Sequence, residues 1–308
     1  MGKKSENEHR KILVKVRNYD DLEEIIRSGN ESIEIYQSPL VTSDNKIEKV
    51  HIQHCKKAIG ISKYAGTTAT LIELGRLPII HKAHGLAIKY WLRLREGTSN
   101  IFVNNAYTEN KTEYLDWYQS IQSLLCINGF RNVWEQGSIM PKTFHKVFVN
   151  RLNDQFIQGA TSKINESERY PVLNTIGYNY QFSSYLNKIT CPDIRTIFTK
   201  IRLDFNALNE SRFRINMADS PACRICNEES EDINHLLFRC SYFNTFRTSF
   251  LDKMRATDMR FLVLPENYKL KYILNMECPE KLSGLVCNFV SNIYNSCINF
   301  NSEENGIV

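Results

Sequence analysis

Apolar residues recur every three or four positions along most of the chain, which is the spacing of one face of an α-helix. The pattern starts near residue 47, after a polar opening segment of mixed charge. Within that segment Lys11–Val16 alternates like a short strand, and Asp20–Arg27 has the spacing of one short helix. Because no series of strands and tight turns follows, the sequence predicts an all-α fold in the form of a multi-helix array.

Turn residues divide the helical pattern into separate elements. Gly75 fits the end of one helix, and Pro78 suits the first turn of the next. Asn128-Gly129 ends another helix with strong turn chemistry. The predicted helices cover residues 47–58, 67–75, 78–95, 113–127, 142–164, 180–189, 193–208, 231–254, 267–275 and 280–299.

Composition is that of an ordinary globular protein. The 308 residues are 42% hydrophobic and 24% charged, and the formal net charge is +5. A basic excess of this size permits contact with phosphates or anionic lipid without requiring either. No run of about 18 apolar residues is present, so we expect no transmembrane helix. The polar start, Met1–Arg10, indicates no signal peptide and favours an intracellular location, in the nucleus or cytoplasm.

Nine cysteines need an explanation in a chain expected in a reducing compartment, where clustered cysteines more often bind metal than form disulfides. Cys223 and Cys226 are separated by two residues, His235 follows after eight more, and Cys240 after a further four. This CCHC spacing is typical of a small loop in which four protein ligands complete a tetrahedron around zinc and leave no open position for catalysis. The sequence therefore predicts one structural zinc ion as a cofactor.

The alternative for this cluster is a set of core cysteines with one chance histidine, which the polar stretch Asn227–Ser230 between its two halves disfavours. Two histidine pairs, His51 with His54 and His81 with His84, leave a second metal site near Cys55 as a less favoured hypothesis. The six remaining cysteines are interpreted as small buried hydrophobic residues. They are Cys55, Cys126, Cys191, Cys278, Cys287 and Cys297.

The cysteine–histidine pattern and its flanks resemble a known family. The segment from Cys223 through Glu231-Asp232, His235 and Cys240 to Arg247 closely resembles the zinc segment near the C-terminus of non-LTR (LINE-type) retrotransposon polyproteins, next to their reverse transcriptase. Further segments are similar to jockey-like elements of that family, and they occur in the same order. These segments are residues 47–62, 73–78, 90–94, 124–134, 151–156 and 199–202.

The resemblance implies a region that grips an RNA template or target DNA while a polymerase core copies it. It also implies an organisation into four parts. These are an N-terminal segment of undefined role (1–45), a helical thumb- or linker-like region (46–208), a CCHC zinc-binding segment (209–256) and C-terminal helices (257–308).

The chain departs from the family where catalysis would lie. A reverse transcriptase needs carboxylates for two metal ions, one pair of them in a Phe/Tyr-x-Asp-Asp turn. The nearest string, Tyr19-Asp20-Asp21-Leu22, lacks the intervening residue. Gly159-Ala160 stands where the family usually shows tryptophan, and Glu210-Ser211-Arg212 replaces its Glu-x-Gly-Arg. We therefore assign no catalytic residue and expect no enzymatic activity from this chain alone.

Basic residues near the predicted zinc ion are the candidate contacts to nucleic acid. Such residues neutralise phosphates in a salt-dependent and largely sequence-independent way, and Phe213, between two arginines, is placed to stack on a base. For each single residue the alternative is a solvated helix face or an ordinary core aromatic. The predicted contacts are Arg195, Lys200, Arg202, Arg212, Arg214, Arg224 and Arg239.

The sequence thus predicts a zinc-containing, RNA- or DNA-binding remnant of a LINE-type reverse transcriptase. Two alternatives stay open: a fragment of a full RNA-directed DNA polymerase polyprotein, and a helical protein-interaction scaffold. An in-frame polymerase core upstream would favour the fragment. A flat response to single-stranded RNA in a salt series would favour the scaffold.

Overall fold

The structure is a computed structural model that describes residues 46–136 and 140–304. These residues form helices and no strand, apart from two isolated bridges that join Leu74 to Phe182 and Ala222 to Ser230. The all-α prediction is therefore confirmed for the described part of the chain. The predictions for Lys11–Val16, Asp20–Arg27 and the string at residues 19–22 lie outside the described residues.

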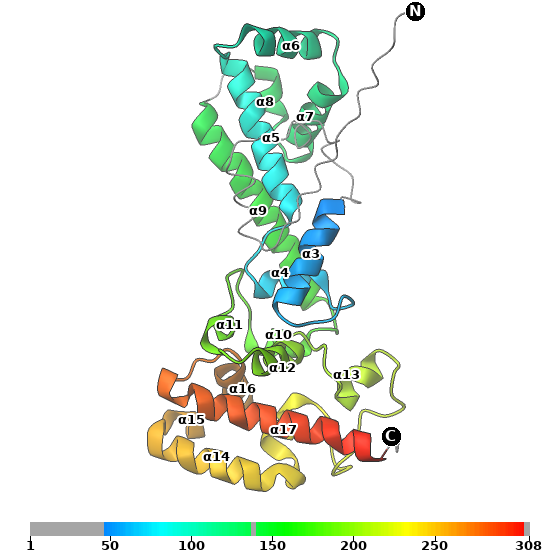
Figure 1. Cartoon of the computed structure of the whole chain (residues 1–308), viewed down its shortest axis with the longest axis vertical. Coiled ribbons are helices and arrows are strands. Elements are labelled where there is room, and N and C mark those ends of the chain that lie inside the picture. Colours follow the sequence, from blue (N-terminus) through cyan, green and yellow to red (C-terminus); the bar gives the residue numbers. More distant parts are fainter. Residues whose placement is uncertain (1–45, 137–139, 305–308) are drawn as a thin grey trace, which may run out of the picture.

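The molecule is elongated, and its helices form an upper and a lower group in Figure 1. The upper group is built on two long helices that lie side by side, α5 and α9. Helices α3 and α4 lie between the two groups. The bounds are α3 (Lys46–Ala58), α4 (Thr67–Glu73), α5 (Ile79–Glu96), α6 (Ile101–Thr112), α7 (Asp116–Ile127), α8 (Arg131–Gln136) and α9 (Pro141–Asn165).

The lower group packs short helices against two longer ones, α14 and α17, as Figure 1 shows. The chain between α13 and α14 contains the predicted cysteine–histidine cluster. The bounds are α10 (Pro171–Ile176), α11 (Tyr185–Lys188), α12 (Pro192–Arg202), α13 (Asn209–Arg214), α14 (Asn244–Thr257), α15 (Arg260–Val263), α16 (Glu266–Leu274) and α17 (Ser283–Glu304).

Two apolar cores match the two groups. The upper core contains Trp91 and Leu125, and the lower core extends from Cys55 on α3 to Cys297 on α17. Helix α9 belongs to both, because Phe148 is buried in the upper core and Ile164 in the lower one. The lower core crosses the predicted boundaries at residues 208 and 256. The cysteine–histidine segment is therefore part of a shared core and does not pack by itself.

A tight turn after α4 fixes the contact between α4 and the chain before α11. Gly75 has a left-handed φ of +58°, and a Cβ there would lie 2.5 Å from the backbone nitrogen of Phe182. The neighbouring Ser183 nitrogen donates to the carbonyl of Glu73 at 2.9 Å. Glycine is thus required here both by the backbone conformation and by the closeness of a second backbone segment.

Several predicted elements differ from the structure. Helix α6 was missed because none of its residues is buried, so its sequence lacks an apolar stripe. The helix predicted for residues 193–208 ends at Arg202, and the one predicted for 180–189 is reduced to α11. The single helix predicted for residues 231–254 was wrong, since it is broken at Cys240. No helix among the described residues is long and apolar enough to cross a membrane.

Candidate metal centre

The first half of the centre is a tight loop, the cysteine loop (residues 221–231). Its ends are tied by the Ala222–Ser230 bridge, and the Cys223 nitrogen donates to the Glu229 carbonyl at 2.7 Å. The Asn227 nitrogen donates to the Cys223 carbonyl at 2.8 Å, which closes the turn around the two cysteines. Asn227 has a left-handed φ of +58°, a conformation that asparagine adopts more readily than most residues. The loop therefore turns both sulfur atoms to its inner side.

The second half of the centre is a helical turn that stops abruptly. Asp232 accepts a hydrogen bond from the His235 nitrogen at 2.7 Å, and a π-helical turn then covers His235–Arg239. At Cys240 the backbone leaves the helix, with φ −51° and ψ 122°, while its nitrogen still donates to the His235 carbonyl at 2.7 Å. This break brings Cys240 to the same side as His235. In a continuous helix the two residues, five positions apart, would point about 140° away from each other, so the break is needed to bring them together.

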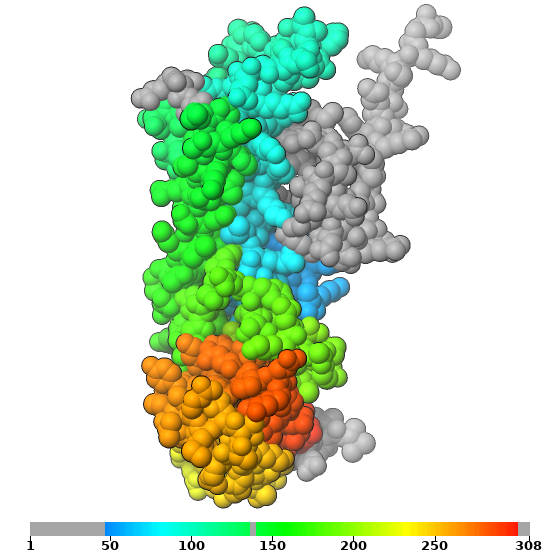
Figure 2. Space-filling model, turned by 90° about the vertical axis from the view of Figure 1, so that its left-hand side faces the viewer, coloured from blue at the N-terminus to red at the C-terminus, as the bar shows by residue number. Residues whose placement is uncertain are grey.

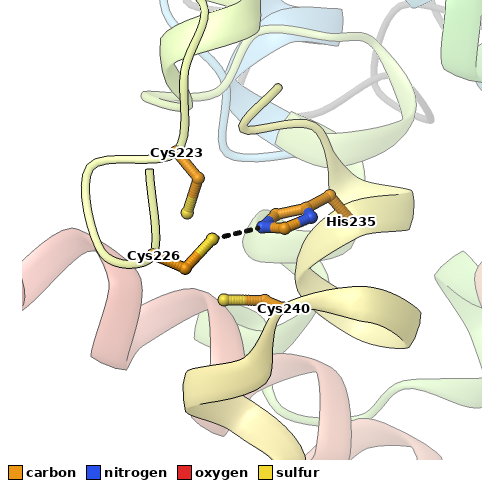
Figure 3. Close-up of side chains that lie close together, drawn as sticks. All are labelled: Cys223, Cys226, His235 and Cys240. Atoms are coloured by element: carbon orange, nitrogen blue, oxygen red, sulfur yellow. Dashed lines mark hydrogen bonds between the residues drawn. The ribbon is translucent and has the colours of Figure 1, made fainter. Parts of the chain in front are cut away.

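The four predicted ligands converge. One ligand atom from each of Cys223, Cys226, His235 and Cys240 lies within 4.8 Å of the others, and Figure 3 shows all four side chains pointing toward one another. The Cys226 sulfur lies 3.2 Å from Nε2 of His235. Cys223, His235 and Cys240 are buried. The cluster can hold a metal ion, and in the described part of the chain no other group of three or more such side chains converges in this way.

Burial makes these thiols poor acids when no cation is near. It raises the pKa of Cys223 to about 12, with a further increase from the sulfurs of Cys240 and Cys226. It also raises the pKa of Cys240, with a further increase from the sulfur of Cys226. The ordinary pKa of a cysteine is about 8.5, so both side chains would stay neutral near pH 7 without a positive charge among them. A metal ion supplies that charge, since it binds the thiolate form and displaces the proton.

The carboxylate of Glu229, which lies outside the cluster, positions the ring of His235. Glu229 lies 3.4 Å from Nδ1 of His235, close enough for an ion pair although the geometry falls short of a hydrogen bond. Arg239 donates to the same Glu229 oxygen at 2.6 Å and also contacts Glu266 on α16. Such second partners fix the orientation of a metal-binding histidine. No sequence motif pointed to Glu229, because its role depends on a fold that brings it back to the histidine.

Glu231 connects the cysteine loop to α13 through hydrogen bonds. The Glu231 side chain is fully buried. It accepts hydrogen bonds from the backbone nitrogen and from the side-chain Nε of Arg224, both at 2.9 Å. It also accepts from the Asn209 nitrogen at 3.1 Å. The sequence placed Glu231 in the first turn of a helix, but the structure uses it as a buried acceptor instead. Arg224 is engaged by this carboxylate and by the Ala207 carbonyl at 3.0 Å.

Arg202 was predicted to contact nucleic acid, and that assignment is corrected here. Its side chain is only 4% exposed and pairs with the fully buried Glu73 at 2.9 Å. A phosphate outside the molecule cannot reach this guanidinium. The sequence showed a basic residue on an amphipathic helix, whereas the structure uses it inside the core.

The other predicted contacts differ in how strongly they are engaged. Arg214 pairs with Asp204 at 2.5 Å and Arg239 with Glu229, so their charges are largely compensated. Arg195 and Arg212 each donate to a backbone carbonyl, of Leu186 and Met217, and keep their net charge. Lys200 is half-buried, and Phe213 is 43% exposed. The arginines near the candidate metal thus mostly hold the local fold together.

The remaining cysteines and histidines lie apart from the cluster. Four of the six scattered cysteines are buried as predicted, but Cys191 is exposed and Cys126 only partly buried. His51 is buried between Glu48, at 3.4 Å, and the sulfur of Cys55, at 3.5 Å, with one ring nitrogen toward each. These two partners lie on opposite edges of the ring. They do not surround a common point, so the second metal site is not formed among the described residues.

Comparisons with models of protein families, with curated proteins and with solved structures find no match to this chain. The likeness to LINE-type elements therefore rests on the order and spacing of sequence motifs alone.

Proposed function

We propose that this chain is a zinc-containing, nucleic-acid-binding protein derived from the C-terminal region of a LINE-type retrotransposon reverse transcriptase, with a binding role and no catalytic one. The observation that carries the proposal is the convergence of Cys223, Cys226, His235 and Cys240. The same four residues are the core of the motif on which the family resemblance rests. A chance similarity of spacing would not require the four side chains to meet.

Zinc is the metal that this donor set fits best. Three thiolates and one imidazole are soft and borderline ligands, and a tetrahedral set of sulfur and nitrogen favours zinc over the oxygen-seeking calcium and magnesium. Four protein ligands leave no position for a reacting water. The ion would therefore join the cysteine loop to the turn at residues 235–240 and add to the stability of the lower group.

Metal analysis of the purified protein tests the zinc half of the proposal. Native mass spectrometry, with elemental analysis of the same sample, should give one zinc per chain, and denaturation with a chelator present should release it. A chain that folds with no bound metal, or with iron in place of zinc, would contradict this half.

Filter binding tests the nucleic-acid half. The protein should retain single-stranded RNA or duplex DNA on a filter at low salt, and the logarithm of the binding constant should fall linearly with the logarithm of salt concentration. The net charge of +5 and the order of the family-like motifs support this expectation. Weak binding without salt dependence would favour the alternative of a protein-interaction scaffold.

A further inference from the structure

Ion pairing in the lower group compensates the charge of four of the predicted phosphate-binding arginines. Arg202, Arg214, Arg224 and Arg239 are each matched by a carboxylate. If the chain binds nucleic acid, most of the electrostatic attraction must come from other residues. The long helices of the upper group are the place to look, because α5 and α9 together contain eight lysines and arginines and only two carboxylates, Glu96 and Asp154.

Helices α5 and α9 run antiparallel with a close contact between them. His145 approaches the Gly85 carbonyl to 3.0 Å, and a Cβ on Gly85 would lie 3.2 Å from Val149. Further along, the ring centroids of His81 and Phe156 lie 5.7 Å apart. Residue numbers along α5 therefore decrease in the direction in which those along α9 increase, as in an antiparallel pair. Figure 2 shows the two helices, cyan and green, side by side along the upper half of the molecule.

Four exposed cations flank this contact on one side. Lys89 and Arg93 follow the α5 positions that face α9, and Lys142 and Lys146 follow the α9 positions that face α5. Each step along an α-helix rotates the side chain by about 100° around the helix axis. In two antiparallel helices that face each other, the residues one step after the facing positions therefore lie on the same side of the helix pair. All four residues are exposed. We call this group, Lys89, Arg93, Lys142 and Lys146, the α5–α9 basic face.

The opposite side of the α5–α9 pair is apolar and covered. Trp91 on α5 and Phe144 and Phe148 on α9 are buried there, in the upper core with α7 and α8. The basic face is therefore the solvent side of this pair, and the packing of the core holds its backbone in place. With a rise of 1.5 Å per residue and a helix separation of about 8–10 Å, the Cα atoms of the four residues span roughly 6 by 9 Å.

We propose that the α5–α9 basic face contacts the phosphates of a nucleic-acid duplex, which refines and rests on the binding role proposed above. A duplex presents one charge for about every 1.7 Å of its axis, so a patch of this size faces several phosphates at once. Binding of single strands usually also needs aromatic side chains for base stacking. Within α5 and α9 the exposed large hydrophobic side chains are limited to Val147. A duplex backbone is the partner that this surface fits.

Two variants of equal net charge test the surface. One carries Lys89→Gln, Arg93→Gln, Lys142→Gln and Lys146→Gln. The other carries Arg151→Gln, Lys163→Gln, Lys253→Gln and Lys281→Gln, at exposed positions outside the basic face. Glutamine keeps helix propensity close to that of lysine and arginine, so both variants should fold, and circular dichroism with zinc content checks that they do.

Fluorescence anisotropy with duplex DNA, duplex RNA and single-stranded RNA across a salt series gives the readout. The basic-face variant should lose up to about 3.6 from the slope of log K against log salt for duplex DNA, at about 0.9 for each phosphate contact. The control variant should keep most of the slope. Binding to single-stranded RNA should be weaker in the wild type and less affected by either variant.

Three outcomes would overturn the proposed surface or its partner, and a fourth would remove the binding role on which it rests. If wild type binds but the basic-face variant keeps its slope, the surface is wrong while the binding role stands. If both variants lose the same amount, only the overall charge matters. If single-stranded RNA binds more tightly than duplex DNA, and the basic-face variant reduces its salt slope by as much, the duplex is the wrong partner. Failure of the wild type to bind any nucleic acid would instead remove the binding role itself, and this surface with it.

Discussion

Arg202 and Glu73 form a buried ion pair, with 2.9 Å between a guanidinium nitrogen and a carboxylate oxygen. Arg202 also donates to the Leu274 carbonyl at 3.0 Å and lies over the ring of Tyr185, with its guanidinium carbon 4.7 Å from the ring centroid. These contacts tie α4, α11, α12 and α16 together. Arg202, which the sequence predicted to bind phosphate, therefore holds four helices of the lower core together.

Breaking this pair should destabilise the fold strongly. Arg202→Met leaves the Glu73 carboxylate buried without its cation, and we expect the free energy of unfolding in urea to fall by about 3–5 kcal/mol. The double variant Glu73→Leu/Arg202→Met removes both charges and should recover part of that loss. If the single variant is as stable as wild type, the pair does not exist as described.

Cys226→Ser should lower metal content and stability together. Structural zinc contributes about 10–16 kcal/mol in isolated zinc-finger peptides. Here the cysteine ligands also lie in or against the large apolar lower core, so we expect a loss on the order of only a few kcal/mol. Cys191→Ser, at an exposed cysteine outside the cluster, is the matched control and should change neither quantity. Unchanged metal stoichiometry in Cys226→Ser, measured by native mass spectrometry, would rule out this ligand set.

Glu229→Gln should weaken metal binding without unfolding the protein. The carboxylate beside Nδ1 of His235 holds the ring with Nε2 toward the sulfur atoms, and outer partners of this kind contribute roughly 10–100-fold in metal affinity. Competition with a coloured chelator measures the loss. Its neighbour Glu228 is exposed, so Glu228→Gln provides the control. Equal affinities in the two variants would contradict a positioning role for Glu229.

His51 makes stability depend on pH above neutrality. Burial alone would lower its pKa, but hydrogen bonds from the ring to Cys55 and Glu48, with their electrostatic attraction, outweigh burial and raise the pKa to about 9. Because the pKa of the folded state lies above the ordinary value of 6.5, the added stability is complete below pH 6.5 and is lost as pH rises through 9. We expect a decline on the order of 3 kcal/mol across this window. Urea unfolding at pH 6, 7.5 and 9.5 should show it in wild type, and a decline of the same size in His51→Gln would assign it elsewhere.

Gly75→Ala should cost more than the same change at Gly97. Both glycines have a left-handed φ, of +58° and +84°, so both substitutions introduce backbone strain of about 1 kcal/mol or more. Only at Gly75 would the new Cβ also meet backbone atoms, 2.5 Å from the Phe182 nitrogen, while Gly97 faces open space. Thermal unfolding compares the two variants. Equal losses would show that conformation alone, without the close contact, decides these positions.

The sequence alone determined the features that depend on local spacing. Period and turn residues located α5 and α9 to within a residue or two, and the spacing of Cys223, Cys226, His235 and Cys240 identified the cluster. Both signals are short-range: an apolar stripe must repeat with the helix, and two cysteines on one tight turn must stay close in sequence. Exposed helices such as α6 carry no such stripe and were missed.

Tertiary structure decided which charges are free and where the helix after the cysteine loop ends. The sequence pattern predicts that Arg202 and Arg224 are exposed. In the structure Arg202 is buried against Glu73, which is distant in sequence, and the half-buried Arg224 pairs with Glu231, which the cysteine loop brings back to it. The break at Cys240 likewise brings its sulfur to those of Cys223 and Cys226 and to the ring of His235, and this convergence outweighs helix propensity. Helical period is set by neighbours along the chain, whereas the burial and pairing of a charge are set by what the fold places against it.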